Sequence, residues 1–159
     1  MKSIFTSKGE EILVSDEDFD ALSKVAWWVR EGYAIRTIYV GGKKRCEYMH
    51  RVILGLPYGS KDCGDHINMN KLDNRRENLR TCSNAENQRN RGMYRTNSTG
   101  YKGVVLHKQS GKFRAQIKHN GVRQDLGQFA TAGEAAHAYN KAAIRLHGDF
   151  AVLNPVGAA

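Results

Sequence analysis

The chain of 159 residues is long enough for one compact domain or two small ones. Its apolar content of 40% excludes wholesale disorder, and no apolar run approaches the roughly 20 residues that cross a bilayer, so we expect no membrane partner. The first residues lack the apolar stretch of a secretory signal, which predicts a cytoplasmic protein. The 25 basic residues outnumber the 16 acidic ones and concentrate after residue 70, and the net charge of +9 indicates a polyanionic partner.

The three cysteines, Cys46, Cys63 and Cys82, form no Cys-x-x-Cys pair. Their odd number and spacing indicate neither a disulfide framework nor a two-pair zinc site. We interpret them as reduced, mostly buried, small apolar side chains. The alternative is a zinc ion held by Cys63 and His66 with one of the other two cysteines, a spacing that matches no standard zinc site.

Residues 1–55 predict a small supporting layer of α+β type. Ser15 and the three acidic residues after it are typical of a helix start, because a hydroxyl caps the first turn and carboxylates suit the positive end of the helix dipole. β-rich runs at residues 32–40 and 44–53 flank a Gly-Gly pair, which permits the positive φ angles of a tight hairpin.

Residues 56–80 are dense in Gly, Asn, Asp and charged side chains, and apolar anchors are sparse. Such a stretch usually consists of loops that carry function. The capping-box pattern of residues 83–86 then predicts a helix that starts there and carries Asn87, Asn90 and Arg91 along one face.

The polar stretch at residues 93–99 predicts a linker, and residues 100–154 predict a separate module. Three strands are expected, at residues 101–107, 112–119 and 122–129. A second capping box at residues 131–134 opens a helix with an Ala-rich apolar stripe, which stops near Gly148. The expected fold class is therefore α+β, ending in a three-stranded antiparallel sheet packed on one helix.

Four polar residues form the candidate cleavage site: Asp65, His66, Asn78 and Asn87. Hydrolysis of a phosphodiester needs a base to activate water, and a neutral imidazole such as that of His66 serves near pH 7. It also needs a divalent cation, and the hard oxygen donors of Asp65 and Asn87 suit Mg²⁺ or Mn²⁺. A buried Asn78 amide can hold the intervening loop rigid by bonding backbone groups on both sides.

These four positions carry a resemblance to the HNH endonucleases, especially the phage and intron-associated homing type. The segments that resemble this family are residues 49–51, 64–80 and 84–90. The resemblance implies a ββα-metal fold in which His66 is the general base, Asp65 and Asn87 hold one divalent ion, and Asn78 orients the loop. Many family members have His where this chain has Asn87, and this substitution favours Mg²⁺ or Mn²⁺ over a softer metal.

For other residues near the motif, the sequence allows both a functional and a structural interpretation. The resemblance brings His50 near the site, although a histidine at a strand end is as often structural. Arg75 and Arg91 are expected to support the site. Arg75, Arg76 and Arg80 are candidate phosphate contacts, with a solvated charged loop as the alternative. Any one of the four motif residues alone would be read as an ordinary turn or loop residue.

On the strand expected at residues 112–119, period-two geometry puts the polar side chains on one face, opposite the helix. Such a basic face can lie in the major groove of DNA, where Lys and Arg suit guanine and Gln suits adenine. The module resembles the plant ethylene-response-factor DNA-binding domain at residues 101–104, 111–117, 126–129, 135–143 and 153–154. The resemblance implies DNA contacts from Lys102, His107, Lys112, Gln116, Lys118 and Arg123.

Two basic residues, Lys108 and Arg114, are added to these contacts because their charges would displace counterions from the phosphates. Val105 stands where the plant family carries arginine and Asp125 where it often has tryptophan, so the plant target sequence is not transferred. An ordinary solvated sheet face is the alternative reading.

The leading hypothesis is a metal-dependent, homing-type DNA endonuclease that needs no small-molecule cofactor. Residues 56–92 cut double-stranded DNA and residues 100–154 hold it, in the cytoplasm of a bacterial host if a phage encodes the chain. The alternative is a DNA-binding regulator whose HNH site has decayed, and the intact motif favours the enzyme. RNA binding is a weaker reading, because an A-form duplex hides its major groove. The residues do not specify an oligomeric state.

Overall fold

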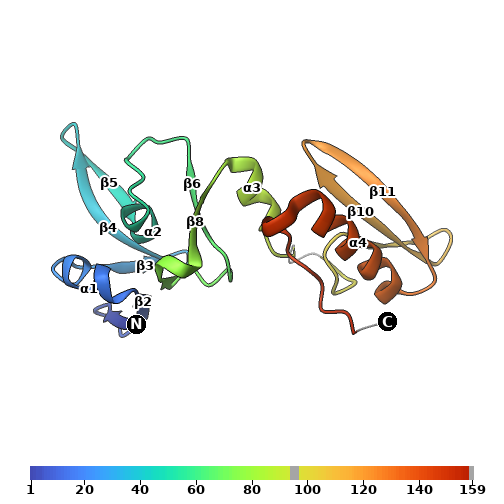
Figure 1. Cartoon of the computed structure of the whole chain (residues 1–159), viewed down its shortest axis with the longest axis horizontal. Coiled ribbons are helices and arrows are strands. Elements are labelled where there is room, and N and C mark those ends of the chain that lie inside the picture. Colours follow the sequence, from blue (N-terminus) through green and yellow to red (C-terminus); the bar gives the residue numbers. More distant parts are fainter. Residues whose placement is uncertain (94–96, 158–159) are drawn as a thin grey trace. The chain divides into compact units, whose positions relative to one another are not determined.

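The computed structural model describes residues 1–93 and 97–157, which fall into two compact units, Met1–Asn87 and Gln88–Ala159. Figure 1 labels their helices and strands. In the first unit the strands are β1 (Lys2–Phe5), β2 (Glu11–Val14), β3 (Trp28–Arg30), β4 (Tyr33–Val40), β5 (Lys43–Tyr48), β6 (Cys63–His66), β7 (Asp73–Asn74) and β8 (Leu79–Cys82). Its helical segments are α1 (Asp16–Leu22), α2 (Met49–Ile53), the 3-10 turn η1 (Arg76–Asn78) and α3 (Asn84–Arg89), which ends in the second unit.

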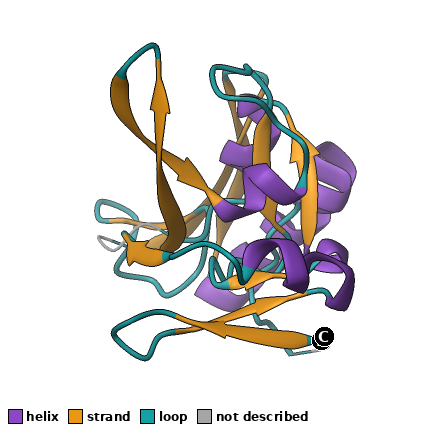
Figure 2. Ribbon diagram, turned by 90° about the vertical axis from the view of Figure 1, so that its left-hand side faces the viewer, coloured by secondary structure: helices purple, strands orange, loops and turns teal. Residues whose placement is uncertain are grey.

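The first unit is built from three small sheets, in the orders β1-β2-β7, β3-β4-β5 and β6-β8. Figure 2 shows helices in purple and strands in orange. Apolar side chains from β2, α1 and α2, among them Ile12, Val14, Leu22 and Met49, form one buried core. The parallel pairing of β2 with β7 fixes the loop around β7 on this core, far from β2 in sequence.

The second unit is an antiparallel sheet covered on one face by a helix. Its elements are β9 (Val104–His107), β10 (Lys112–His119), β11 (Val122–Phe129), α4 (Ala132–His147) and the 3-10 turn η2 (Gly148–Phe150). The strand order is β11-β10-β9, and the small buried residues Ala135, Ala136 and Ala143 let α4 lie close to the sheet. Gly103 is required at this contact, because a Cβ there would lie 2.1 Å from Cδ2 of Tyr139.

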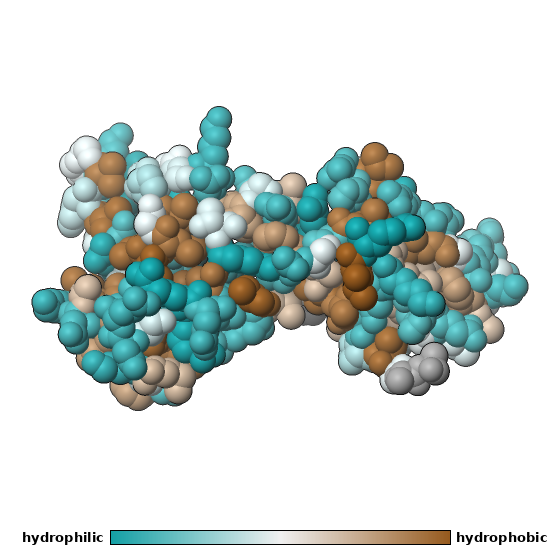
Figure 3. Space-filling view, viewed as in Figure 1, coloured by the Kyte–Doolittle hydropathy of each residue, from teal (hydrophilic) through white to brown (hydrophobic). Residues whose placement is uncertain are grey.

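The expected α+β class, with the sheet and helix of the second unit, agrees with this mixed architecture of small sheets and four α-helices among the described residues. Residues 94–96 of the expected linker lie outside the described residues. Hydrophilic residues (teal) and apolar ones (brown) are interspersed on the surface of both units in Figure 3. Within residues 1–93 and 97–157, none of the helices has the length and apolar character that a membrane crossing requires.

One strand prediction is wrong in its second half. The run at residues 44–53 was expected to stay extended, but β5 ends at Tyr48 and α2 follows. Met49 and Ile53 are one helical turn apart, and both are buried in the core, which favours helix over strand here. His50 therefore lies on a helix and not at a strand end.

Four smaller expectations also change. Ser15 precedes α1, but its hydroxyl accepts a hydrogen bond from the Arg76 backbone N–H instead of capping the helix. Asp65 and His66 lie on β6 and not in a loop. The first strand of the second unit begins only at Val104, and α3 ends before Asn90 and Arg91.

The cysteines were expected to be mostly buried, and this is wrong for one of them. Cys82 is buried, Cys63 is partly buried and Cys46 is exposed on β5. All three are free thiols.

Candidate active site and nucleic-acid interface

Asp65 and His66 end β6, whose partner strand β8 positions Arg80 opposite Asp65 and Leu79 opposite His66. Adjacent strand residues point to opposite faces, so the two side chains serve different faces of the β6-β8 ribbon. Both are almost fully enclosed, with 6% of Asp65 and 5% of His66 exposed. Asp65 and His66 are thus neighbours in the chain, but their side chains contact different residues on the two faces of the ribbon.

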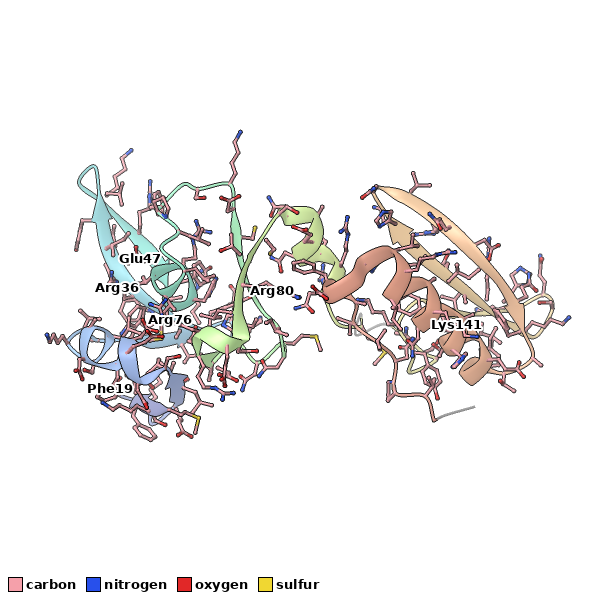
Figure 4. All side chains as sticks on the ribbon, viewed as in Figure 1. Phe19, Arg36, Glu47, Arg76, Arg80 and Lys141 are labelled. Atoms are coloured by element: carbon pink, nitrogen blue, oxygen red, sulfur yellow. The ribbon has the colours of Figure 1, made fainter. Side chains whose placement is uncertain are left out.

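The face that carries Asp65 also carries Arg80 and Cys63. Nε and Nη2 of Arg80, labelled in Figure 4, both lie 2.8 Å from Oδ2 of Asp65. Cys63 donates its S–H to Oδ1 of Asn84 at 3.0 Å, which brings the start of α3 to this face. Asn87 follows Asn84 by three residues, so it lies on the same side of α3 and is partly buried there.

The face that carries His66 is aromatic. The rings of His50 and His66 meet edge to face with centroids 4.9 Å apart, and the Tyr33 ring lies 6.1 Å from that of His66. Gly64 permits this packing, because a Cβ there would lie 2.5 Å from Cδ2 of His50.

Both histidines are neutral near pH 7. Burial lowers the pKa of His50 to about 3, and the nearby His66 adds to the effect. Burial also lowers the pKa of His66, although the hydrogen bond to Oδ1 of Asn74 and the charges of Asp65 and Asp73 oppose the shift. A neutral imidazole is the form that can accept a proton.

Asn78 lies in η1 and is 5% exposed. Its Oδ1 accepts a hydrogen bond from the Asn68 backbone N–H at 2.9 Å, and its Nδ2 donates to the Asp73 carbonyl at 2.7 Å. The Ile67 backbone N–H donates to the Asn78 carbonyl at 2.9 Å. One buried amide therefore ties both sides of the loop that joins β6 to β7.

The arginines of this region are paired with acidic side chains. Nε and Nη2 of Arg75 donate to the two oxygens of Asp73, each at 2.7 Å, and this pair lowers the pKa of Asp73. Arg76, labelled in Figure 4, donates in the same way to Asp18 on α1. Arg91 is exposed and belongs to the second unit.

Sequence reasoning missed Asp73 and Asn74, which are among the most deeply buried side chains of the first unit, with 2% and 1% exposed. Asn74 Oδ1 lies 3.3 Å from Nε2 of His66. The contact depends on how the loop between β6 and β7 folds and on the pairing of β7 with β2, so no local pattern indicated it. An Asp followed by an Asn in a loop-like sequence usually indicates a turn.

The donors near Asp65 fit a hard divalent cation. Asp65 and Asn87 offer a carboxylate and an amide oxygen, and Mg²⁺ commonly takes one or two protein oxygens and completes its shell with water and phosphate. Among residues 1–93 and 97–157, no group of three His, Cys, Asp or Glu side chains could hold a metal by itself. The zinc alternative is not supported, because Cys63 and His66 point to opposite faces of β6.

The outer face of the second sheet is polar. Ala115 and Ile117 on β10 are buried toward α4, so the intervening Arg114, Gln116 and Lys118 point the other way. Neighbouring strands pair Lys112 with His107, Lys118 with Arg123, and Gln116 with Asp125. Lys108 lies exposed in the turn between β9 and β10.

Two basic residues of this unit already have partners. Arg114 donates through Nε and Nη2 to Oδ2 of Asp125, whose Oδ1 accepts from the Gly127 backbone N–H at 3.1 Å. Lys102 donates through Nζ to the carbonyls of Arg89 and Arg91 at 2.7 and 2.6 Å. Burial lowers the pKa of Lys102 to about 8. Lys102 thus binds the end of α3.

Comparison with known proteins gives two kinds of match. Residues 47–89 match the family model of the HNH endonucleases. An uncharacterized HNH endonuclease of Acanthamoeba polyphaga mimivirus is 28% identical over 150 residues, covering 94% of this chain and 77% of the viral protein. No solved structure matches the chain.

The second kind of match is to plant proteins. The AP2-like ethylene-responsive transcription factor CRL5 of Oryza sativa subsp. japonica is 37% identical over 98 residues, covering 56% of this chain. The AP2-like ethylene-responsive transcription factor ANT of Arabidopsis thaliana is 32% identical over 130 residues, covering 75% of this chain. The matches span only 15% and 23% of these plant proteins. Both resemblances drawn from the sequence are confirmed, and with them the expectation of an enzyme of the HNH endonuclease type.

Proposed function

We propose that this nuclease is a metal-dependent, homing-type HNH endonuclease that hydrolyses phosphodiester bonds in double-stranded DNA at a site selected partly by residues 100–154. The observation that carries the proposal is the buried pair Asp65 and His66 at the end of β6, with the following loop closed by Asn78. Such a rigid pair of an acid and a neutral imidazole suits hydrolysis of a phosphodiester.

In this proposal His66 is the general base. Its lowered pKa keeps the imidazole neutral, so that it takes a proton from the attacking water as the water oxygen bonds to phosphorus. Asn78 is the residue that holds the β6-β7 loop, and with it the direction of the His66 side chain. The His50 ring packs edge to face against the His66 ring and helps to hold its orientation.

Asp65 and Asn87 are the proposed ligands of one Mg²⁺ or Mn²⁺ ion, and β6, β8 and α3 are the proposed ββα-metal arrangement. When bound, the ion would offset charge on the scissile phosphate and the leaving oxygen. Arg80 balances the charge of the Asp65 carboxylate in the buried ribbon.

We propose that the outer face of the β9-β10-β11 sheet enters the major groove. Gln116 can read a base edge there, and the remaining residues contact phosphates or bases. This set comprises His107, Lys108, Lys112, Arg114, Lys118 and Arg123. Lys102 is the member of the predicted set for which this role is least supported, because its ammonium group is already bonded to two carbonyls.

The test is incubation of the purified chain with supercoiled plasmid and phage DNA, with and without Mg²⁺, followed by electrophoresis. Nicked or linear products at discrete positions, only when the cation is present, are the expected result. Duplex binding without cleavage under every cation tested would overturn the proposal and favour a DNA-binding regulator with a decayed site.

A further inference from the structure

Asn74 lies at a junction between the N-terminal sheet and the proposed active site. It is paired with Val14 in the parallel contact of β7 with β2, and the Leu13 backbone N–H donates to the Leu72 carbonyl at 2.9 Å. Only 1% of Asn74 is exposed. The first strands of the chain, which lie outside the motif of the HNH endonucleases, therefore help to hold the backbone of this residue in place.

The direction of the Asn74 amide follows from its two neighbours. Its Nδ2 lies 3.4 Å from the Lys71 carbonyl and donates to it, so its Oδ1 is the atom that faces His66. The reversed amide would bring its oxygen against the Lys71 carbonyl oxygen, where neither can donate. The atom 3.3 Å from Nε2 of His66 is thus an acceptor only.

A neutral imidazole carries its proton on one ring nitrogen and its lone pair on the other. Because an amide oxygen can only accept, the Nε2 of His66 must carry the proton in this contact. The lone pair then lies on Nδ1. Each ring nitrogen of a histidine is assigned its role by the hydrogen bond that the other makes.

We propose that Asn74 is a positioning residue that fixes the tautomer of His66, so that Nδ1 is the atom that takes the proton from water. This rests on the proposed function of His66 as the base. In the step, one water proton moves to Nδ1 while the water oxygen bonds to phosphorus. The bond from phosphorus to the leaving oxygen breaks, and that oxygen keeps the electron pair and is protonated by solvent. Asn74 Oδ1 holds the Nε2 proton throughout.

The first measurement reads the tautomer itself and does not depend on activity. The full chain, labelled with ¹⁵N and free of divalent ions, gives imidazole nitrogen shifts by NMR, and the signals lost in His66→Gln assign those of His66. We expect the Nε2-protonated form at neutral pH. The Nδ1-protonated form in the wild-type chain would overturn the proposal, whether or not any variant folds.

The second measurement compares Asn74→Leu with Asn74→Asp, which keeps an oxygen acceptor. Asn74→Leu is expected to mix the tautomers of His66 and to lower kcat by about 10-fold to 100-fold with little change in KM. Asn74→Asp is expected to keep the Nε2-protonated form and to recover part of kcat. A chain that folds as Asn74→Leu with an unchanged tautomer and full kcat would refute the role.

The matched control is Asn70→Leu, the same substitution in the same loop. Asn70 is exposed, and its Oδ1 accepts a hydrogen bond from the Leu72 backbone N–H at 3.1 Å. We expect Asn70→Leu to leave the His66 tautomer and kcat as they are in the wild type, and an equal loss in both variants would contradict the specific role of Asn74. Full cleavage by His66→Ala would instead defeat the proposed base, while the NMR result on Asn74 would still stand.

Discussion

Asp65 on β6 lies directly opposite Arg80 on β8, and Oδ2 of the carboxylate accepts a hydrogen bond from Nε of the guanidinium at 2.8 Å. The carboxylate is 6% exposed, so without a cation beside it the cost of its desolvation would be several kcal/mol. Arg80 supplies that charge from within the protein. We therefore expect the first unit to keep its fold without a bound metal ion.

The first prediction concerns removal of the metal. Chelation should abolish cleavage, and Mg²⁺ or Mn²⁺ should restore it, while the thermal unfolding midpoint changes little. Unfolding followed by circular dichroism, with and without chelator, measures this. Stoichiometric zinc in the purified chain, with loss of structure when it is removed, would contradict the expectation.

The second prediction isolates the buried ion pair. Arg80→Ala should lower the free energy of unfolding of the metal-free chain by about 3 kcal/mol, because it removes the guanidinium that lies beside the buried Asp65 carboxylate. Addition of Mg²⁺ should recover part of the loss. Arg76→Ala is the control: the side chain of Arg76 is 51% exposed, against 17% for Arg80, and loss of its pair with Asp18 should cost less than about 1 kcal/mol. Equal losses in the two variants would show that burial of the pair is unimportant.

The third prediction follows from the proposed base. His66→Ala should lower cleavage by at least about 100-fold and leave duplex affinity almost unchanged, because the imidazole acts in the reaction and not in binding. Gel electrophoresis and fluorescence anisotropy on the same duplex separate the two effects. Parallel losses of binding and cleavage, or full activity in the variant, would count against His66 as the base.

The fourth prediction is that residues 88–159 fold and bind duplex DNA without the first unit. They hold a complete sheet and helix with their own buried clusters. The fragment starts at Gln88 because Lys102 needs the carbonyls of Arg89 and Arg91. Each phosphate contact should add about −0.9 to the slope of log affinity against log salt. If the fragment folds but binds no duplex at low salt, the outer face of the sheet is an ordinary solvated surface and not a DNA-binding surface.

The fifth prediction separates base reading from phosphate contact on that face. Gln116→Ala should relax sequence preference at one position by about 1–3 kcal/mol, because Gln116 points outward from the middle of β10. Lys108→Ala should weaken binding to all sequences alike and make the salt slope shallower. Selection of binding sites from random duplexes, with titrations at several salt concentrations, distinguishes the two. If Gln116→Ala instead weakens binding to all sequences by the same factor, Gln116 does not contact a base.

The second unit was the easier one to predict from sequence. Its strands are joined by Gly-containing turns and its helix begins at the Thr131 capping box, so the signals that delimit its elements are local. Such signals act over a few residues and can be read directly. The start of β9 and the bonds from Lys102 to the carbonyls of Arg89 and Arg91 departed from expectation, and these bonds join residues that are distant in sequence.

In the first unit, the motif located Asp65, His66, Asn78 and Asn87, but it did not give their surroundings. Alternation and β-propensity predicted strand through residues 44–53, where burial of Met49 and Ile53 favours a helix turn. The partners of His66 come from α2 and β7, and those contacts depend on tertiary packing. When a polar residue is buried because a strand distant in sequence pairs with it, the residues next to it in the sequence do not indicate that burial.

Because β2 pairs with β7, we expect the segment that folds as a nuclease to begin earlier in the chain than the HNH motif does. The segment that matches the family model begins at residue 47, yet one edge of the loop that carries Asp73 and Asn74 is held by residues near position 14. A gene that transferred residues 47–89 into another protein would carry every motif residue but not the strand that seats this loop. We therefore expect exchange of this nuclease between proteins to need the whole unit from Met1 to Asn87, or a host that supplies an equivalent strand.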